Sequence, residues 1–297
     1  MNLIKVKIKE IWKLTIPITT SFVAIGMMGI VDTIIVGRYD TNQLAYMGIA
    51  NSVFMILFTI PIALLQGVMI KTSQKFGARK FASCGKIYNE GRRYLVFLAI
   101  IFTAIGLGGV HILKLLGQTD QMAYQGGKIL QVLSLSIPFI LLGVNANFFL
   151  QSIKRPHISM YSAIAANVIN IIINPVVVYG LFGVPEMGAM GAAGTTVIIR
   201  VFLAIFSLVY IAFMKKSPKL TRRFGLDRKY DTWWFDSRTT RKIGFGVAIT
   251  TVATNGSFSM SNIFAGWLGE QIMATYVIIT TVGGILFMLF FSITQAT

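Results

Sequence analysis

The stretch LTIPITTSFVAIGMMGIVDTIIV, residues 14–36, decides the fold, because it is an apolar run that holds a single charged side chain, Asp32. A helix of roughly 20 apolar residues is enough to cross the hydrocarbon core of a bilayer, which is about 30 Å thick. A basic segment, residues 1–13, precedes the run. The run is nevertheless too long for a signal peptide and lacks a small-residue cleavage site. We therefore predict a retained membrane-spanning helix.

Similar apolar runs recur along the rest of the chain, separated by charged residues or by clusters of Gly, Pro, Asn and Asp. They cover residues 44–70, 94–116, 129–150, 161–183, 192–214, 243–268 and 272–293. Of the 297 residues, 55% are hydrophobic and 12% are charged, and the mean hydropathy is +0.72. Soluble domains carry about twice that charged fraction. The sequence therefore predicts an all-α integral membrane protein, a polytopic helical bundle with eight spans.

The reactive residue types argue against several classes of enzyme. The one cysteine, Cys84, excludes a disulfide within the chain and a cysteine-based metal cluster, and the two histidines, His111 and His157, lie far apart in the sequence. The sequence contains no P-loop, no nucleophile elbow and no paired carboxylates within the spans. We therefore predict that the protein is not an enzyme, and that any pumping draws on an ion gradient or on a partner ATPase.

The basic residues indicate how the spans are oriented. Lys and Arg number 27 against 10 acidic residues, which gives a net charge of +17. Of these 27, 23 fall in segments that the alternating spans place on one side of the membrane, residues 1–13, 71–93, 154–155 and 215–242. This bias predicts a multi-pass protein of the cell membrane with a cytoplasmic N-terminus. Because the charges sit between apolar runs, we expect them to attract anionic lipid, and we expect no nucleic-acid partner.

The long basic loop, residues 215–242, divides the chain. Trp233, Trp234 and Phe235 within it are expected to lie at the membrane interface. The sequence after the loop resembles the beginning of the chain: a shift of 229 residues sets Gly37 on Gly266, each at the end of an apolar run that follows a basic lead. Two related halves of six spans would require twelve spans and about 450 residues.

The repeat predicts three parts. They are a first six-helix lobe (1–214), a cytoplasmic basic loop (215–242), and the first two helices of a second lobe whose remaining helices are missing (243–297).

Polar residues within the spans are the candidate site. Asp32 is the one acidic residue that falls inside a predicted span, since the other nine, Glu90 among them, fall in predicted loops or at span ends. Intramembrane acids cost several kcal/mol and commonly mark ion paths, although an Asp near a helix end can also lie at the interface. Asn167, Asn170 and Asn174 form a stripe on the fifth span. These amides either line an ion site or bond neighbouring helices.

Three further polar residues are candidates for a polar cavity. Asn145 and Asn147 lie in the fourth span, and Arg200 lies in the sixth. Arg200 is expected to pair with an acid or to extend its side chain toward the membrane surface.

Three motifs, in this order and spacing, resemble the multidrug and toxic compound extrusion (MATE) transporters. They are VDTIIVGR (31–38), NVINIIINPVVVYG (167–180) and FGVPEMGAMGAAGTTVI (182–198). The resemblance implies a fold of twelve helices in two lobes around a central cavity, of which this chain holds eight. It also implies export of small amphipathic, often cationic compounds in exchange for H⁺ or Na⁺, with no cofactor besides that coupling ion.

The resemblance also assigns residues. By position, Asp32 is similar to the family's first-helix acid, whose protonation or Na⁺ binding is coupled to substrate release. Asn170 and Asn174 fall where the family often has an Asn and an Asp or Asn beside that acid. Asn145 and Asn147 are both candidates for a polar position of the fourth helix. No metal other than Na⁺ at Asp32 is implied.

Two alternatives remain open at this stage. A related flippase of lipid-linked saccharides would need several cationic residues in its cavity to hold a pyrophosphate, whereas Arg200 is the one clear cation inside the first six spans. An inactive, truncated membrane fragment would explain why eight spans stand where the repeat requires twelve.

Overall fold

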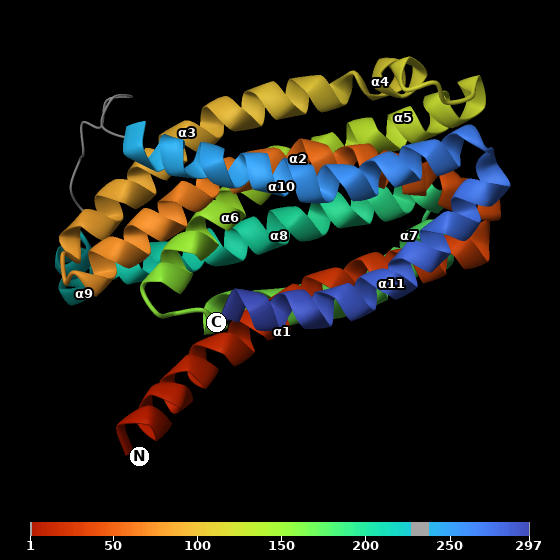
Figure 1. Cartoon of the computed structure of the whole chain (residues 1–297). Coiled ribbons are helices and arrows are strands. Elements are labelled where there is room, and N and C mark those ends of the chain that lie inside the picture. The colour runs from red at the N-terminus through yellow and green to blue at the C-terminus, as the bar shows by residue number, and fades with distance from the viewer. Residues whose placement is uncertain (1, 227–237, 297) are drawn as a thin grey trace.

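A computed structural model describes residues 2–226 and 238–296, and within them all side chains except those of residues 2–15, 22, 255, 258 and 284–296. Trp233, Trp234 and Phe235 lie outside the described residues. The chain is helical throughout the described ranges, with no strand in them, so the all-α prediction is confirmed. Figure 1 shows the long helices running side by side.

Every predicted span coincides with one helix or with two consecutive helices that are bent against each other. The helices are α1 (Asn2–Tyr39), α2 (Thr41–Gly77), α3 (Ala82–Leu107), α4 (Gly109–Leu115), α5 (Asp120–Ser134), α6 (Ile137–Ser152), α7 (His157–Tyr179), the short 3-10 helix η1 (Leu181–Gly183), α8 (Gly188–Lys216), α9 (Pro218–Phe224), α10 (Arg238–Trp267) and α11 (Glu270–Ala296). The third and fourth predicted spans are the bent pairs: α3 and α4 meet at 65°, and α5 and α6 at 42°.

Among the described residues, four helices (α1, α2, α7 and α8) are long and apolar enough to cross a membrane, or six if each bent pair counts as one span. The last two predicted spans correspond to α10 and α11. α10 is interrupted by Thr, Ser and Asn residues, and the side chains of α11 beyond residue 283 lie outside the described part.

The helices extend past the apolar runs, which corrects two sequence-based expectations. The predicted loop, residues 215–242, contains the end of α8, all of α9 and the start of α10. Glu90 lies within α3 with 5% of its surface exposed, not in a loop. Hydropathy marks only the apolar part of a helix, whereas the backbone hydrogen bonds of the helix continue through charged turns. Hydropathy therefore places the helix ends too far inward.

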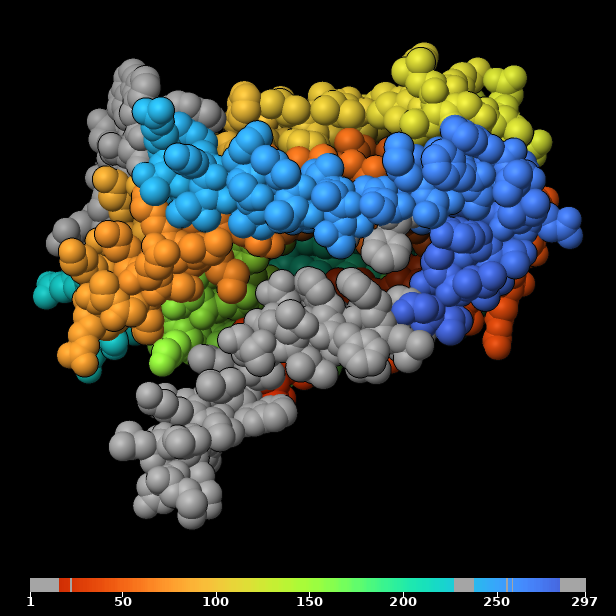
Figure 2. All heavy atoms as spheres, viewed as in Figure 1, coloured from red at the N-terminus to blue at the C-terminus, as the bar shows by residue number. Residues whose placement is uncertain are grey.

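Glycines let α10 pack closely on α2. A Cβ atom on Gly67 of α2 would lie 2.0 Å from the carbonyl oxygen of Thr240, and one on Gly244 of α10 would lie 2.0 Å from that of Leu64. The two backbones are therefore in contact at Gly67 and Gly244, which have no side chains to separate them. Figure 2 shows α10 lying over α2 along the visible face.

The turn between α10 and α11 is held to the first helices by polar contacts. Trp267 Nε1 donates to the carbonyl oxygen of Leu116 at 2.5 Å, and Gln118 Nε2 donates to that of Ile263 at 3.1 Å. Tyr46 donates its hydroxyl to Glu270 at 3.1 Å. α11 then returns along α1 and α2, so the hairpin that α10 and α11 form covers one face of the preceding bundle (Figure 1).

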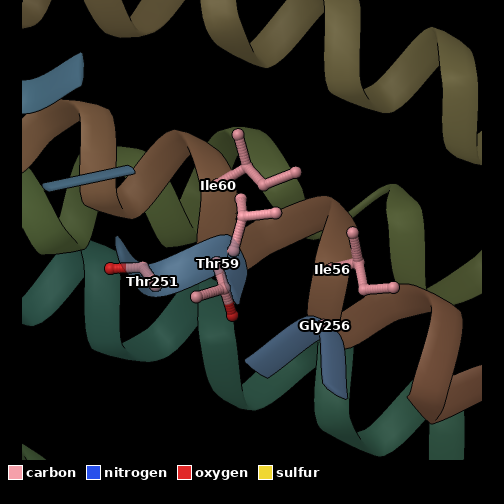
Figure 3. Close-up of a pocket in the computed structure, with 6 residues that line it drawn as sticks. Ile56, Thr59, Ile60, Thr251 and Gly256 are labelled. Carbon is pink, nitrogen blue, oxygen red and sulfur yellow. The ribbon is translucent and has the colours of Figure 1, made fainter. Parts of the chain in front are cut away.

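A small recess remains between α2 and α10 (Figure 3). It is lined by Ile56, Thr59, Ile60, Thr251, Val252 and Gly256. Its volume is about 10 Å³, which is enough for at most a single water molecule. The recess reflects imperfect side-chain packing at this interface and is too small to hold a substrate.

Candidate functional site

Asp32 is the centre of a buried polar cluster between α1, α7 and α8. Its side chain is 5% exposed. One carboxylate oxygen, Oδ1, accepts hydrogen bonds from the amide nitrogens of Asn170 at 3.1 Å and Asn174 at 2.5 Å. The other, Oδ2, accepts from the hydroxyl of Thr196 at 3.2 Å. Two of the three predicted asparagines therefore meet the predicted acid.

Helix packing explains this arrangement. α1 packs against α7, and α7 packs against α8, so the three helices converge on the carboxylate. Asn170 and Asn174 are four residues apart on α7 and so share one face of that helix. Both are fully buried, so their amide nitrogens are shielded from bulk solvent and donate to Asp32 instead. These helices thus satisfy a buried carboxylate with neutral hydrogen-bond donors rather than with a cationic side chain.

The amide oxygens of these two asparagines are a second feature of the cluster. Asn170 Oδ1 and Asn174 Oδ1 are buried, and neither accepts a hydrogen bond from the described residues. Buried polar atoms normally have a partner, so each such oxygen requires an explanation. Together with Asp32 and the Thr196 hydroxyl, they form a set of hard oxygen atoms, which suits Na⁺ or a proton-carrying water. No group of three or more His, Cys, Asp and Glu side chains able to hold a metal ion occurs among the described residues.

Asn167 does not join this cluster. Its amide nitrogen donates to the backbone carbonyls of Ala24 at 2.5 Å and Ala163 at 3.1 Å. α1 and α7 run in the same direction, so the earlier residue of α7, Asn167, meets an earlier part of α1. Ala24 accordingly lies about two turns before Asp32 along α1. The stripe of amides on α7 therefore serves two purposes: Asn167 ties α7 to the α1 backbone, and the two later asparagines hold the carboxylate.

The fourth-span asparagines also lie apart from Asp32. Asn145 Nδ2 donates to the carbonyl oxygen of Tyr88 at 3.3 Å and so links α6 to α3. Asn147 Oδ1 accepts from the hydroxyls of Ser159 at 3.0 Å and Ser207 at 2.9 Å, which links α6 to α7 and α8. Both amides connect helices, as expected for polar groups that find partners within a bundle.

Arg200 has neither of the two arrangements that the sequence suggests. Its Nη1 donates to the hydroxyl of Ser136 at 2.8 Å, and its guanidinium carbon lies 4.5 Å from the ring centroid of Phe54 and 5.8 Å from that of Phe58. No carboxylate of the described residues forms an ion pair with it. The aromatic faces stabilise the cation in place of an acid.

Thr196 is the site residue that sequence reasoning missed. It also donates to the Ala192 carbonyl at 3.0 Å, as a threonine within a helix commonly does. One signal was available: Thr196 precedes Arg200 by four residues, so the two share a face of α8. That face points into the helix bundle.

Comparisons with known proteins agree with this fold. The MatE family model matches residues 17–176, more than half of the chain. The chain is 29% identical to "Probable multidrug resistance protein NorM" of Caulobacter vibrioides over 97% of this chain and 60% of that protein. It is 25% identical to "Multidrug resistance protein PmpM" of Pseudomonas aeruginosa over 99% of this chain and 61% of that protein.

Solved structures show the same fold. The crystal structure of the eukaryotic MATE transporter AtDTX14 matches with a TM-score of 0.82 at 17% identity, covering 97% of this chain and 63% of that one. The MATE multidrug transporter DinF-BH in complex with rhodamine 6G matches with a TM-score of 0.79 at 19% identity, over 97% of this chain and 63% of that one. The chain spans about 60% of the length of the curated relatives it matches. It belongs to the MatE family, the multidrug and toxic compound extrusion (MATE) transporters.

Proposed function

We propose that the protein exports small amphipathic or cationic compounds in exchange for H⁺ or Na⁺, and that Asp32 is the residue that binds the coupling ion. The observation that carries the proposal is a buried carboxylate with three neutral donors and, beside it, two amide oxygens that accept no hydrogen bond from the described residues. The names of the NorM and PmpM relatives and the rhodamine 6G complex of DinF-BH support small organic compounds as the cargo.

Uptake of either ion changes the contacts of Asp32. The ionised carboxylate only accepts hydrogen bonds, and it accepts all three that the cluster donates. A protonated carboxyl group also donates one, and bound Na⁺ requires oxygens rather than N–H groups around it. Na⁺ therefore requires the amides of Asn170 and Asn174 to turn their oxygens inward, and the O–H of a protonated Asp32 requires at least one neighbouring group, such as one of these amides, to turn an oxygen toward it. Ion uptake therefore changes the contacts between α1, α7 and α8.

This change couples the ion to the substrate. A ligand shifts a conformational equilibrium only if it binds the two states with different affinity. The coupling ion favours the arrangement with the amide oxygens turned inward, whereas a cationic group of the substrate favours the ionised carboxylate. The two therefore compete for one negative charge, which produces exchange. The charge bias of the loops supports a cytoplasmic N-terminus in the cell membrane.

Reconstituted vesicles test this function. The protein is placed in liposomes, and rhodamine 6G movement is followed after imposing a pH gradient alone or a Na⁺ gradient alone. We expect one of the two gradients to drive dye movement against its concentration gradient. Movement of labelled lipid without dye movement would favour a flippase instead, and no movement of either would contradict the proposal.

The two kinds of asparagine on α7 are expected to respond differently to truncation. Asn174→Ala removes the shortest contact of Asp32 and should shift the coupling-ion concentration needed for half-maximal dye movement by roughly tenfold. The shift is downward if the ion is H⁺, because a hydrogen bond that stabilises the ionised carboxylate by about 1.5–3 kcal/mol is lost, and upward if the ion is Na⁺, because an amide oxygen is lost as a ligand. Asn167→Ala removes bonds to backbone carbonyls only, so it should lower thermal stability and leave this concentration unchanged. Equal shifts in both variants would contradict the assignment.

A further inference from the structure

A cavity of about 190 Å³ lies between the beginnings of α2, α5 and α8. Its lining includes Gln43, Tyr46, Gln125, Ile129, Met187 and Met190. An apolar cavity of about 150 Å³ can bind benzene, so this one has room for an aromatic ring with a short substituent. The cavity is separate from the Asp32 cluster, because the described residues around it belong to α2, α5 and α8 or directly precede α8. Along α8, Met190 precedes Thr196 by six residues, which is about 9 Å.

The cavity is polar at its mouth and apolar at its floor. Each of the three helices contributes one residue near its start and a second one about a turn later, which lies deeper because all three helices begin at this end of the bundle. Gln125 and Met187 at the mouth are exposed, whereas Tyr46 and Ile129 at the floor are buried. A ligand that enters therefore places its apolar part inward and its polar part beside Gln125.

Two polar side chains of the cavity wall are fixed by hydrogen bonds to their neighbours. Gln43 Oε1 accepts from the backbone nitrogen of Ala189 at 2.7 Å. The Tyr46 hydroxyl accepts from Gln121 Nε2 at 2.8 Å and donates to Glu270 at 3.1 Å. A wall that is already ordered loses little side-chain entropy when a ligand binds. A ligand in this cavity also packs against Tyr46, the residue that links α2 to α11.

The side chains of the cavity select the chemical class of the ligand. Among the described residues that line it, none carries a charge, so a charged ligand group would be buried there without a partner, at a high cost. The thioethers of Met187 and Met190 and the ring of Tyr46 favour contact with an aromatic ring. The amide of Gln125 both donates and accepts, and it therefore complements a group that has a donor and an acceptor side by side, such as a carboxamide.

We infer that this cavity is a binding site for uncharged aromatic amides, which combine one aromatic ring with a carboxamide group. The ring lies between Tyr46 and Met190, and the carboxamide bonds the side chain of Gln125 at the mouth. The site goes beyond the proposed export function and does not depend on it, because neither Asp32 nor its partners contribute to the lining.

Protection of an introduced cysteine detects ligand in the cavity. Met187→Cys places a thiol at the mouth, and Cys84, the one cysteine of the natural sequence, is fully buried. The rate at which a polar maleimide labels the purified, intact protein in detergent is measured with and without benzamide. A site that is about two-thirds occupied slows labelling by about threefold, and we expect at least this effect. Phe182→Cys is the control, because Phe182 is 93% exposed and lies outside the cavity, so its labelling rate should not change.

Three analogues of benzamide test the ligand class. Benzamidine and benzoate have nearly the same shape but carry a positive and a negative charge at neutral pH. Cyclohexanecarboxamide keeps the amide and lacks the aromatic ring. At equal concentration, we expect each of the three to slow the labelling of Met187→Cys less than benzamide does.

Two glutamine variants, each combined with Met187→Cys, test how the amide is bound. Gln125→Leu removes the polar group at the mouth and should raise the benzamide concentration for half-maximal protection by roughly fivefold, the typical effect of losing one neutral hydrogen bond. Gln131→Leu is the matched control. Gln131 also belongs to α5 but lies outside the cavity, so this substitution should leave the concentration unchanged.

The inference is overturned if benzamide does not slow the labelling of Met187→Cys, if it slows Phe182→Cys equally, or if any of the three analogues protects as well as benzamide. Better protection by benzamidine would mean that Glu270, behind Tyr46, draws cations into the cavity. An unchanged half-maximal concentration in Gln125→Leu would equally contradict the assignment. The assay requires no gradient, so a failure of ion-coupled exchange in vesicles would contradict the proposed function and not this site.

Discussion

Asp32→Asn is expected to reduce gradient-driven dye movement to background while the protein still inserts into the membrane. Asn has nearly the shape of Asp but cannot take up a proton, and it lacks the negative charge that attracts Na⁺. The hydrogen bonds from Asn170 and Asn174 can still be made to its oxygen, and its amide nitrogen can donate to the Thr196 hydroxyl in place of the bond that Thr196 donates to Asp32, so the packing of α1, α7 and α8 is preserved. Without a change of charge, the coupling ion has no state to favour.

Vesicle transport of rhodamine 6G under each gradient measures this effect, and folding is checked by size-exclusion chromatography. Asp40→Asn is the matched control. Asp40 is an exposed acid eight residues further along, and its side chain caps the start of α2 by accepting from the backbone nitrogen of Asn42 at 2.6 Å. Asn caps helices as well as Asp does, so this variant should transport normally. Gradient-driven transport retained in Asp32→Asn would refute the role of Asp32.

Gly244→Ala is expected to cause a large loss of stability at the contact between α2 and α10. A Cβ atom there would lie 2.0 Å from the backbone carbonyl oxygen of Leu64, and a backbone atom cannot move aside as a flexible side chain can. α10 must therefore shift away from α2. Overpacking of this kind costs typically 1–3 kcal/mol, which exceeds the roughly 1 kcal/mol that Ala gains over Gly within a helix.

Gly246→Ala is the control for this prediction. Gly246 lies two residues further along α10, is exposed, and has no atom within 4 Å of the place where its Cβ would be. This substitution should raise thermal stability slightly, through helix propensity alone. The midpoint of thermal unfolding in detergent measures both variants. If Gly244→Ala is as stable as Gly246→Ala, then α2 and α10 do not pack as closely as described.

The membrane-spanning architecture was predictable because hydropathy is a local property of the sequence. A bilayer selects apolar runs of about 20 residues, and such runs can be recognised without any knowledge of their neighbours. The bends between α3 and α4 and between α5 and α6 were not predictable in this way. Gly108 separates the first pair and Ser136 lies within the second break, but neither residue is sufficient to specify a bend in a membrane helix.

The candidate site was predictable in part. An acid within an apolar span is conspicuous in the sequence, and amides four residues apart share a helix face, so Asp32, Asn170 and Asn174 could be proposed together. Asn167 has the same chemistry and a similar spacing, yet it bonds the α1 backbone instead. Which of these asparagines reaches Asp32 depends on how far α7 is shifted along the axis of α1. That shift is fixed only when the two helices pack, so it cannot be read from the sequence of either helix.

The sequence by itself determined that the chain is a bundle of membrane helices, where most of those helices lie, and that Asp32 is buried among them, whereas the burial of Glu90 in α3 was not predicted. Tertiary structure alone decided that Thr196 completes the shell of Asp32, that Arg200 rests on Phe54 instead of on an acid, and that α10 touches α2 through glycines. The physical reason is the range of the interactions. Burial in lipid depends on each residue and its near neighbours in the chain, whereas these contacts join helices that are far apart in the sequence and exist only after the helices have packed.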